Sequence, residues 1–211
     1  MYMVFADRKQ AGKLLAERLG KFKGESCVVC ALPRGGVVLG AEIAREYDWP
    51  MELILVRKIG HPYNPEYAVC AVSEGGVKYS EEGKESLDQG WLKKEMEKGR
   101  QEIKRRKEVY LGGRQAVAVG GKIAILVDDG VATGLTFLVA IEELRCRHPR
   151  KIVAALPVMP AEFEKKLKGA VDEVVCLNAD ENYLGSVGAY YMDFPQVTDE
   201  EVISVMTDMV I

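Results

Sequence analysis

The amino-acid sequence predicts an α/β fold with a doubly wound, mostly parallel sheet. Short apolar runs of strand length alternate with longer stretches that place apolar residues at helical spacing. The runs are apolar throughout, which is typical of strands covered by helices on both faces. The chain has 211 residues and no repeat of 20–50 residues, so we expect residues 1–211 to form a single domain.

The first half of the chain supplies two of the expected strands and two helices. Asp7 has a side chain suited to cap a helix, and apolar residues recur at helical spacing over 11–22. The apolar run Val28–Leu32 predicts the first strand, and a helical pattern follows over 37–47. Glu52–Val56 predicts the second strand.

Two segments in the middle of the chain depart from this alternation. Residues 58–76 contain several glycines and prolines, which predicts a loop with one short strand at Ala68–Val72. Residues 81–110 are mostly charged but place apolar side chains at helical spacing, which predicts one long amphipathic helix inserted into the α/β pattern. The default interpretation of such a helix is a solvated surface. Gly112 and Gly113 end it.

The alternation resumes in the second half of the chain with three strands and two helices. The strands are expected at Ile123–Val127, at Ile152–Leu156, where Pro157 closes the run, and at Glu173–Leu177, and the helices at 136–147 and 161–167. In a parallel sheet of this kind, ligands bind at the carboxyl ends of the strands. The loops that follow the strands are therefore the first place to look for a site.

Composition and charge exclude several classes of protein. The net charge is −3, from 29 basic and 32 acidic residues, so the basic excess usual in nucleic-acid-binding proteins is absent. The longest apolar runs are far shorter than the roughly 18 residues of a membrane-spanning helix, and no hydrophobic leader is visible. Five cysteines without a regular framework favour free thiols in a reducing compartment. We therefore expect a cytoplasmic protein that binds neither nucleic acid nor membranes.

Two of the cysteines, Cys27 and Cys30, have a spacing that can bind zinc. They lie in a run that predicts a buried strand, where positions i and i+3 point to opposite faces. The two sulfurs should therefore diverge, and we interpret these cysteines as core residues.

The strongest chemical signal follows the strand at Ile123–Val127. Asp128 and Asp129 are adjacent acids at the end of a buried strand, where two carboxylates cost free energy unless a ligand satisfies them. A vicinal diol can donate one hydroxyl to each acid, and Mg²⁺ can add to this. The alternative is a strand–turn–helix junction whose acids only cap the helix, which one aspartate would fit better than two.

Small residues follow the two acids and open a helix. Their backbone N–H groups can form an anion site at the helix N-terminus. The small residues are Gly130, Ala132, Thr133 and Gly134, and Thr133 and Thr136 add hydroxyl donors. A diol-binding pair followed directly by an anion site predicts a seat for a ribose 5-phosphate.

Two further candidates for anion binding follow the first and second strands. After the first strand, Gly35 and Gly36 allow the backbone to approach an anion closely, and Arg34 supplies positive charge. A plain turn would explain the two glycines equally well. Arg57 and Lys58 follow the second strand, and their alternative is two cations on the surface.

Residues 125–136 resemble the signature of the type I phosphoribosyltransferase family. That signature is a hydrophobic strand, two acids, two mostly aliphatic residues and a phosphate loop that ends in Thr-Gly-x-Thr. Gly130 departs from it, because the family usually has an aliphatic residue there. The resemblance implies that Asp128 and Asp129 hold the ribose hydroxyls of phosphoribosyl pyrophosphate (PRPP) and help to hold Mg²⁺. It also implies a 5-phosphate site formed by Ala132, Thr133, Gly134 and Thr136.

The same resemblance implies a role for the two other candidate segments. Arg34 and Gly35 occupy the position of the family's pyrophosphate loop, which often contains a cis peptide. Arg57 and Lys58 match a pair that leads into a mobile loop closing over PRPP, so both are expected to contact pyrophosphate, and here that loop is 59–76.

The C-terminal stretch resembles the hood of purine-type members of the family. The hood would comprise residues 178–211 together with the N-terminal segment, with Tyr183 stacking on the acceptor and Asp193 near the metal. Enzymes that act on 6-oxopurines carry an aspartate in the phosphate loop, where this chain has Ala132, and a lysine in the segment that matches 154–160, where this chain has none. These departures argue against hypoxanthine or guanine as the acceptor.

The resemblance implies displacement of pyrophosphate from C1 of Mg²⁺-bound PRPP by a nitrogen acceptor, which stays unidentified. The catalytic residues would be Asp128, Asp129, Arg34 and Lys58, and the protein would be a homodimer. One alternative is a regulator that binds PRPP or a nucleotide without catalysis, because fold does not fix function. A receiver-type signalling domain is remote, because it needs acids after the first strand.

Overall fold

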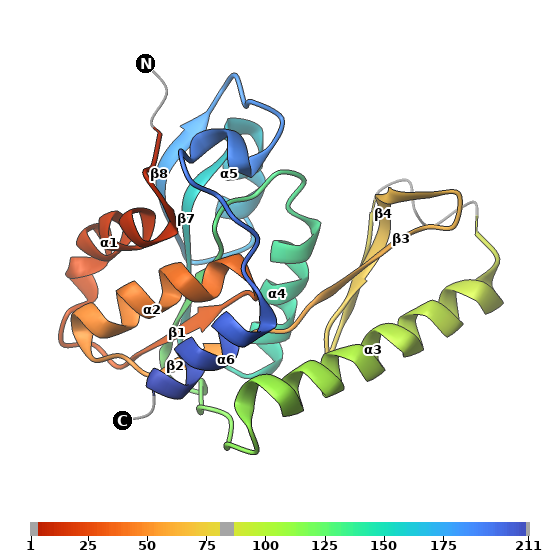
Figure 1. Ribbon diagram of the computed structural model, residues 1–211, viewed down its shortest axis with the longest axis horizontal. Coiled ribbons are helices and arrows are strands. Elements are labelled where there is room, and N and C mark those ends of the chain that lie inside the picture. The colour runs from red at the N-terminus through yellow and green to blue at the C-terminus, as the bar shows by residue number, and fades with distance from the viewer. Residues whose placement is uncertain (1–3, 81–86, 210–211) are drawn as a thin grey trace.

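The computed structural model describes residues 4–80 and 87–209 and contains a five-stranded parallel sheet at its centre (Figure 1). Its strand order is β2 (Met51–Leu53), β1 (Cys27–Ala31), β6 (Ile123–Val127), β7 (Lys151–Pro160) and β8 (Glu173–Asp180). All neighbouring strands of this sheet are parallel. The prediction of a mostly parallel α/β sheet is confirmed.

Helices cover both faces of the sheet, which explains why its central strands are apolar throughout. On one face lie α1 (Arg8–Leu19) and α2 (Gly35–Tyr47), and on the other α4 (Leu135–Cys146) and α5 (Ala161–Lys168). Cys27 packs into the core on the first side and Cys30 into the core on the second. Because the two side chains pack on opposite faces of the sheet, the expected divergence of the sulfurs is confirmed. Both cysteines are free thiols.

Strand β7 runs through Pro157, where the sequence predicted its end. Its pairing with β6 stops at Ala155, whereas its pairing with β8 continues to Pro160. Pro157, which has no N–H to donate, is skipped in the register with β8 between Leu156 and Val158, and the strand continues beyond it.

The prediction of a loop over 58–76 is wrong for most of the segment, but the one short strand predicted within it, Ala68–Val72, is confirmed. This part of the chain forms a second, antiparallel sheet of β3 (Arg57–His61), β4 (Asn64–Val72) and β5 (Val77–Tyr79), in that order. The glycines lie at its irregular points: Gly60 is at a shift in the β3–β4 register, and Gly75 and Gly76 form the turn into β5. Glycine therefore marks a bulge and a turn in this segment.

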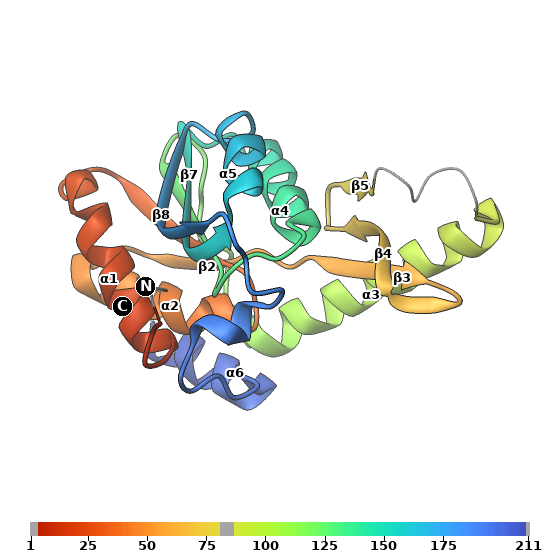
Figure 2. The ribbon, with the colours of Figure 1, turned by 90° about the horizontal axis from the view of Figure 1, so that it is seen from above.

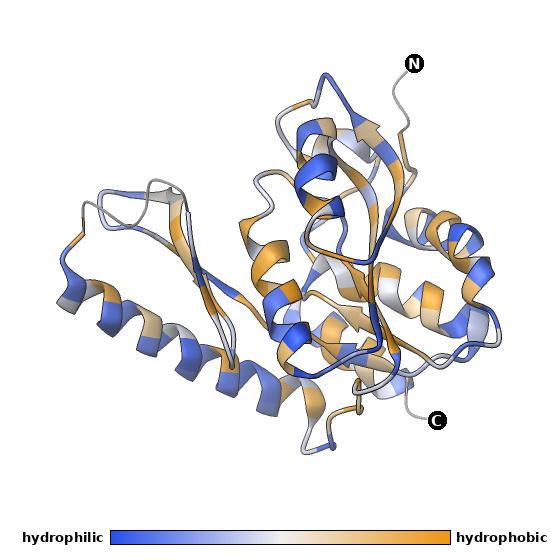
Figure 3. Ribbon diagram, turned by 180° about the vertical axis from the view of Figure 1, so that it is seen from behind, coloured by the Kyte–Doolittle hydropathy of each residue, from blue (hydrophilic) through white to orange (hydrophobic). Residues whose placement is uncertain are grey.

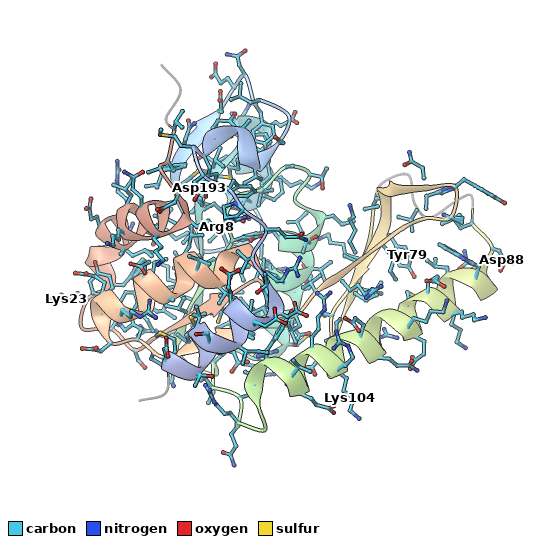
Figure 4. All side chains as sticks on the ribbon, viewed as in Figure 1. Arg8, Lys23, Tyr79, Asp88, Lys104 and Asp193 are labelled. Carbon is cyan, nitrogen blue, oxygen red and sulfur yellow. The ribbon has the colours of Figure 1, made fainter. Side chains whose placement is uncertain are left out.

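The long helix α3 (Gln89–Leu111) follows, shorter at its start than the predicted 81–110. Residues 81–86 of that prediction lie outside the described residues. Asp88 caps the helix by accepting a hydrogen bond from the N–H of Trp91, and Gly112 ends it in the left-handed conformation. Lys104 is exposed on its outer side (Figure 4).

Together, β3–β5 and α3 form an arm, residues 57–79 and 89–111, that extends away from the five-stranded sheet (Figure 2). The view coloured by hydropathy shows hydrophilic residues along much of α3, whereas the strands of the main sheet are largely hydrophobic (Figure 3). In the described residues, no helix combines the length and the apolar content that a membrane crossing requires.

The N-terminal segment contacts residues 191–193 of the C-terminal part of the chain. Phe5 forms an isolated parallel bridge with Tyr191, and the N–H of Asp193 donates to the carbonyl of Ala6. The last helix, α6 (Asp199–Asp208), then packs against α2 and α3. These contacts join the two segments that the sequence analysis groups as a hood.

Candidate active site

The loops after β1 and β6 begin at the same edge of the sheet. Ala31 and Val127 are partners in the register of these neighbouring strands, and the N–H of Leu32 donates to the carbonyl of Val127 at 3.0 Å. The loop that contains Arg34 and the acid pair that follows Val127 therefore lie side by side. This is the arrangement expected for a ligand site at the carboxyl ends of parallel strands.

The contact between these two loops requires glycine at position 35. A Cβ on Gly35 would lie 1.8 Å from Oδ2 of Asp129, a distance at which the two atoms overlap. The peptide bond before Arg34, Pro33–Arg34, is cis. Gly35 thus lets the start of α2 pack directly against the acid pair.

In the described part of the chain, the hydrogen bonds to the Asp128 carboxylate come from backbone donors. Its Oδ1 accepts from the N–H of Asp129 at 2.9 Å, and the N–H of Gly36 also donates to its carboxylate. Burial, with a further contribution from the neighbouring Asp129, raises the pKa of Asp128 well above its usual value. The carboxylate is therefore costly to ionise in the free protein.

Asp129 differs because it has a cationic partner. Its Oδ2 accepts from Nε of Arg8 at 2.8 Å, and its backbone carbonyl accepts from the hydroxyl of Tyr191 at 2.6 Å. Burial raises the pKa of Asp129, and Arg8 opposes that shift. The two adjacent acids thus have distinct electrostatic surroundings.

Arg8 is a site residue that the sequence analysis missed. Its side chain is largely buried, its second donor reaches the carbonyl of Pro195 at 2.6 Å, and its guanidinium lies 3.7 Å from the ring centroid of Phe194 (Figure 4). Its partner Asp129 is 121 residues away, so no local pattern points to the pair. The available signal is a cation at the first position of a helix, where it opposes the helix dipole.

The predicted phosphate loop leads directly into α4. Gly134 is the N-cap of this helix in the left-handed conformation, Ala132 and Thr133 are exposed, and Thr136 is half-buried in the first turn. Gly130, the departure from the family signature, has a φ of +151°, and a Cβ there would lie 2.6 Å from Cγ1 of Val187. The packing of Val187 therefore accounts for glycine at this position.

Arg34 lies at the start of α2 and faces the C-terminal helix. Its NH1 lies 3.4 Å from Oδ1 of Asp199, which also accepts from the hydroxyl of Tyr110 at 2.7 Å. The hydrogen bond from Tyr110 is the main cause of a lowered pKa of Asp199. Neither Tyr110 nor Asp199 was expected near this loop.

Arg57 and Lys58 lie on opposite faces of β3, because side chains alternate along a strand. Arg57 lies on the side of α3, where its Cδ would be 3.6 Å from a Cβ placed on Gly99. Lys58 is paired across the sheet with Ala71, which packs against α4. Of the two, Lys58 is the residue next to α4, the helix into which the phosphate loop leads.

Tyr183 and Asp193 both belong to the C-terminal part of the chain. The ring of Tyr183 stacks on Tyr190 with centroids 5.4 Å apart, and its buried hydroxyl has no hydrogen-bond partner within the described part of the chain. Burial raises the pKa of Tyr183 to about 12. Asp193 is exposed. The acceptor role of Tyr183 and the metal role of Asp193 stay predictions.

A magnesium ion fits the acid pair by the chemistry of its donors. Mg²⁺ prefers oxygen ligands and is usually bound through one or two carboxylates together with substrate phosphates and water. Asp128 and Asp129 provide two carboxylates beside a loop that can bind phosphate. In residues 4–80 and 87–209, no group of three or more His, Cys, Asp or Glu side chains forms a separate metal cage.

Comparisons with known proteins agree with this geometry. The family model described as "Phosphoribosyl transferase domain" matches residues 6–193. A Mycobacterium tuberculosis H37Rv protein named "Putative phosphoribosyl transferase Rv0571c" is 37% identical over 204 residues, which are 95% of this chain and 46% of that protein. This chain therefore spans about half the length of the curated relatives it matches.

Solved structures show the same fold. The crystal structure of the TT1426 protein from Thermus thermophilus is 40% identical with a TM-score of 0.83, and the match covers 98% of this chain and 99% of that one. The AQ2163 protein from Aquifex aeolicus is 14% identical with a TM-score of 0.51, over 82% of this chain and 74% of that one, and shows the fold alone. By its sequence and its fold, the chain belongs to the phosphoribosyltransferase family.

Proposed function

We propose that this protein transfers the phosphoribosyl group of Mg²⁺-bound PRPP to a nitrogen acceptor and releases pyrophosphate. The observation that carries this proposal is the buried pair Asp128–Asp129, which lies against the Gly35 loop and directly before the helix-opening loop of α4. PRPP contains a diol, a 5-phosphate and a pyrophosphate. We assign the acid pair to the diol, the α4 loop to the 5-phosphate and the Gly35 loop to the pyrophosphate.

In this proposal the two acids and the α4 loop hold the ribose phosphate. Asp128 and Asp129 accept hydrogen bonds from the ribose hydroxyls. The backbone N–H groups around Thr133 and Gly134 bind the 5-phosphate, because N–H groups at a helix N-terminus point toward an anion and the helix dipole favours its charge. Thr133 and Thr136 add hydroxyl donors.

Arg34, Gly35 and Lys58 bind the pyrophosphate group in this proposal. Displacement at a glycosidic carbon passes through an oxocarbenium-like transition state in which negative charge builds on the leaving group. Arg34 and Lys58 stabilise that charge as fixed cations. Arg57 contributes at longer range, since its side chain lies on the α3 face of β3. When bound, Mg²⁺ would neutralise part of the pyrophosphate charge.

The acceptor is expected to be a base other than hypoxanthine or guanine. Ala132 stands where a general base would be needed in the phosphate loop, and the described strand β7 has no lysine between Ala154 and Pro160. Stacking on Tyr183 is the contact that we assign to the acceptor.

The test is an acceptor screen with two separate readouts. The protein is incubated with Mg²⁺ and PRPP in the presence of single nucleobases and other nitrogen nucleophiles, and pyrophosphate release and PRPP binding are measured in parallel. Acceptor-dependent release supports the transferase. PRPP binding without release for any acceptor would favour a non-catalytic regulator, and the absence of PRPP binding would refute both the transferase and a regulator that binds PRPP.

A further inference from the structure

The long helix α3 is connected to the candidate pyrophosphate loop through one carboxylate oxygen. Tyr110, in the last turn of α3, is fully buried, and its hydroxyl donates to Oδ1 of Asp199 at 2.7 Å. The same oxygen lies 3.4 Å from NH1 of Arg34. Asp199 thus links the arm to the side chain that we assign to pyrophosphate.

The position of Asp199 is fixed on its own helix as well. Asp199 is the first residue of α6, and Thr198 and Glu201 form a reciprocal capping box around it. A negative side chain in the first turn of a helix is favoured by the helix dipole. The capped helix backbone and the Tyr110 hydroxyl therefore fix the position of the Asp199 carboxylate independently of Arg34.

The ion pair between Arg34 and Asp199 would not draw attention by itself. The two side chains are 31% and 35% exposed, and pairs of that kind usually add little to stability. This pair differs because the buried Tyr110 also donates its hydroxyl hydrogen bond to the half-exposed Asp199. An acid held in this way can limit the rotamers of Arg34 before a ligand arrives, and fewer rotamers are then lost on binding.

The other part of α3 packs on the strand that carries Arg57 and Lys58. A Cβ on Gly99 would lie 2.9 Å from Cγ2 of Val72 and 3.6 Å from Cδ of Arg57, so the helix backbone lies close to β3 and β4 there. At 1.5 Å per residue, Gly99 and Tyr110 are about 16 Å apart along the helix axis. One rigid helix therefore contacts both segments that supply cations.

We propose that α3 is a brace that aligns the two pyrophosphate-binding segments, and that Tyr110 and Asp199 are positioning residues that act through Arg34. This inference rests on the proposed function, because it takes Arg34 as a pyrophosphate contact. It gives the inserted helix a role that its charged surface and amphipathic pattern do not suggest.

The experiment measures two ligands that occupy different parts of the proposed site. Dissociation constants of Mg²⁺-pyrophosphate and of ribose 5-phosphate are determined by calorimetry for the parent and for Asp199→Asn, Tyr110→Phe and Glu200→Gln. Glu200 is the matched control, because it is an exposed acid in the same helical turn. Phe at position 110 keeps the buried ring and removes only the hydroxyl.

Asp199→Asn should weaken pyrophosphate binding by about tenfold, the loss expected for one charge-assisted contact, and Tyr110→Phe should weaken it less, by about threefold. Ribose 5-phosphate binding should stay within about twofold of the parent in both variants, since neither Tyr110 nor Asp199 belongs to the acid pair or the α4 loop that we assign to this ligand. Glu200→Gln should change neither constant. In an Arg34→Lys background, Tyr110→Phe should cause no further loss, because the side chain through which it acts has been replaced.

Five results would overturn the inference. Tighter pyrophosphate binding by Asp199→Asn would mean that Asp199 competes with the ligand for Arg34. Equal weakening of both ligands would mean structural damage, and a loss that persists in the Arg34→Lys background would mean that Tyr110 acts elsewhere. A parent that binds ribose 5-phosphate but no pyrophosphate would remove the role of Arg34 on which the brace depends. A parent that binds neither ligand would instead refute the proposed function, and the brace with it.

Discussion

At the scale of single residues, the site depends on two adjacent acids that have different partners. Asp128 is held by backbone N–H groups, whereas Asp129 is paired with the buried Arg8. The same substitution should therefore change the stability of the protein in opposite directions at the two positions.

Asp128→Asn should leave the free energy of unfolding of the ligand-free protein equal or higher at pH 7. Asparagine keeps Oδ1, which accepts from the N–H of Asp129, and removes a charge that burial disfavours. Chemical denaturation measures the change. A clear loss of stability would mean that the ionised acid is a structural cap.

Asp129→Asn should destabilise the protein by about 3 kcal/mol, because it leaves the buried guanidinium of Arg8 without its counter-ion. The stacking of Arg8 on Phe194 and its bond to Pro195 would hold the unpaired cation in place. The double variant Arg8→Met with Asp129→Asn is the control and should recover part of the loss. If Asp129→Asn unfolds at the same denaturant concentration as the parent, the ion pair contributes nothing.

The acid pair could be predicted from the sequence, and Arg8 could not. Asp128 and Asp129 are adjacent at the end of an apolar run, so local pattern and burial cost are enough to identify them. The contact between Arg8 and Asp129 depends on how both ends of the chain pack beside the sheet, and so does the contact between Arg34 and Asp199. Neither arrangement is encoded in the spacing of residues.

At the scale of elements, the strands of the main sheet were predictable, whereas of the second sheet only the strand at Ala68–Val72 was predicted. The apolar run at Ile123–Val127 became a strand with the same bounds, since a strand buried on both faces must be apolar throughout. β3 and β5 are short and exposed in part, β3 contains Gly60, and β4 begins with Asn64 and Pro65, so most of this segment has the pattern of a loop. These segments become strands because they form hydrogen bonds with one another, and a propensity argument does not include such pairing.

Strand β2 carries a buried acid that permits a test against pH. Glu52 is 2% exposed, accepts a hydrogen bond from the N–H of Val117 at 2.5 Å and lies 3.9 Å from Arg147. Burial raises the pKa of Glu52 in spite of these partners. A folded-state pKa above the unfolded value, about 4.3, means that the native state binds more protons, so this group lowers stability as pH rises through its folded pKa.

Glu52→Gln should therefore raise the melting temperature more at pH 7 than at acidic pH. Glutamine keeps an acceptor for Val117 and removes the ionisation, so the difference from the parent should shrink as pH falls toward about 4. Thermal unfolding at several pH values provides the measurement, with the exposed Glu46→Gln as the control for loss of one carboxylate. A difference that grows toward low pH would contradict the assigned sign.

At the scale of the whole molecule, a sheet with helices on both faces carries an arm on one side (Figure 2). Neither of the two tryptophans is exposed. Trp49 packs against Tyr47 with ring centroids 4.5 Å apart and is buried, and Trp91 is half-buried. Among the described residues, the large apolar side chains that are exposed are Val4, Tyr63, Val77, Val109, Leu184 and Met192.

We expect a homodimer, because oligomers of such proteins commonly cover exposed apolar side chains through a two-fold interface. Light scattering after size exclusion at micromolar concentration should give twice the chain mass of 23.4 kDa. A monomer mass under those conditions would contradict the expectation.

The central claim is that the loops after β1 and β6 form one PRPP site, and calorimetry with Mg²⁺-PRPP tests it most directly. The parent should bind, and Asp128→Asn should weaken binding by roughly tenfold to a hundredfold, the loss of one charge-assisted hydrogen bond. Asp208→Asn, which removes an exposed acid at the end of α6, should bind as the parent does. A folded Asp128→Asn variant with the affinity of the parent, or a parent that does not bind Mg²⁺-PRPP, would contradict the claim.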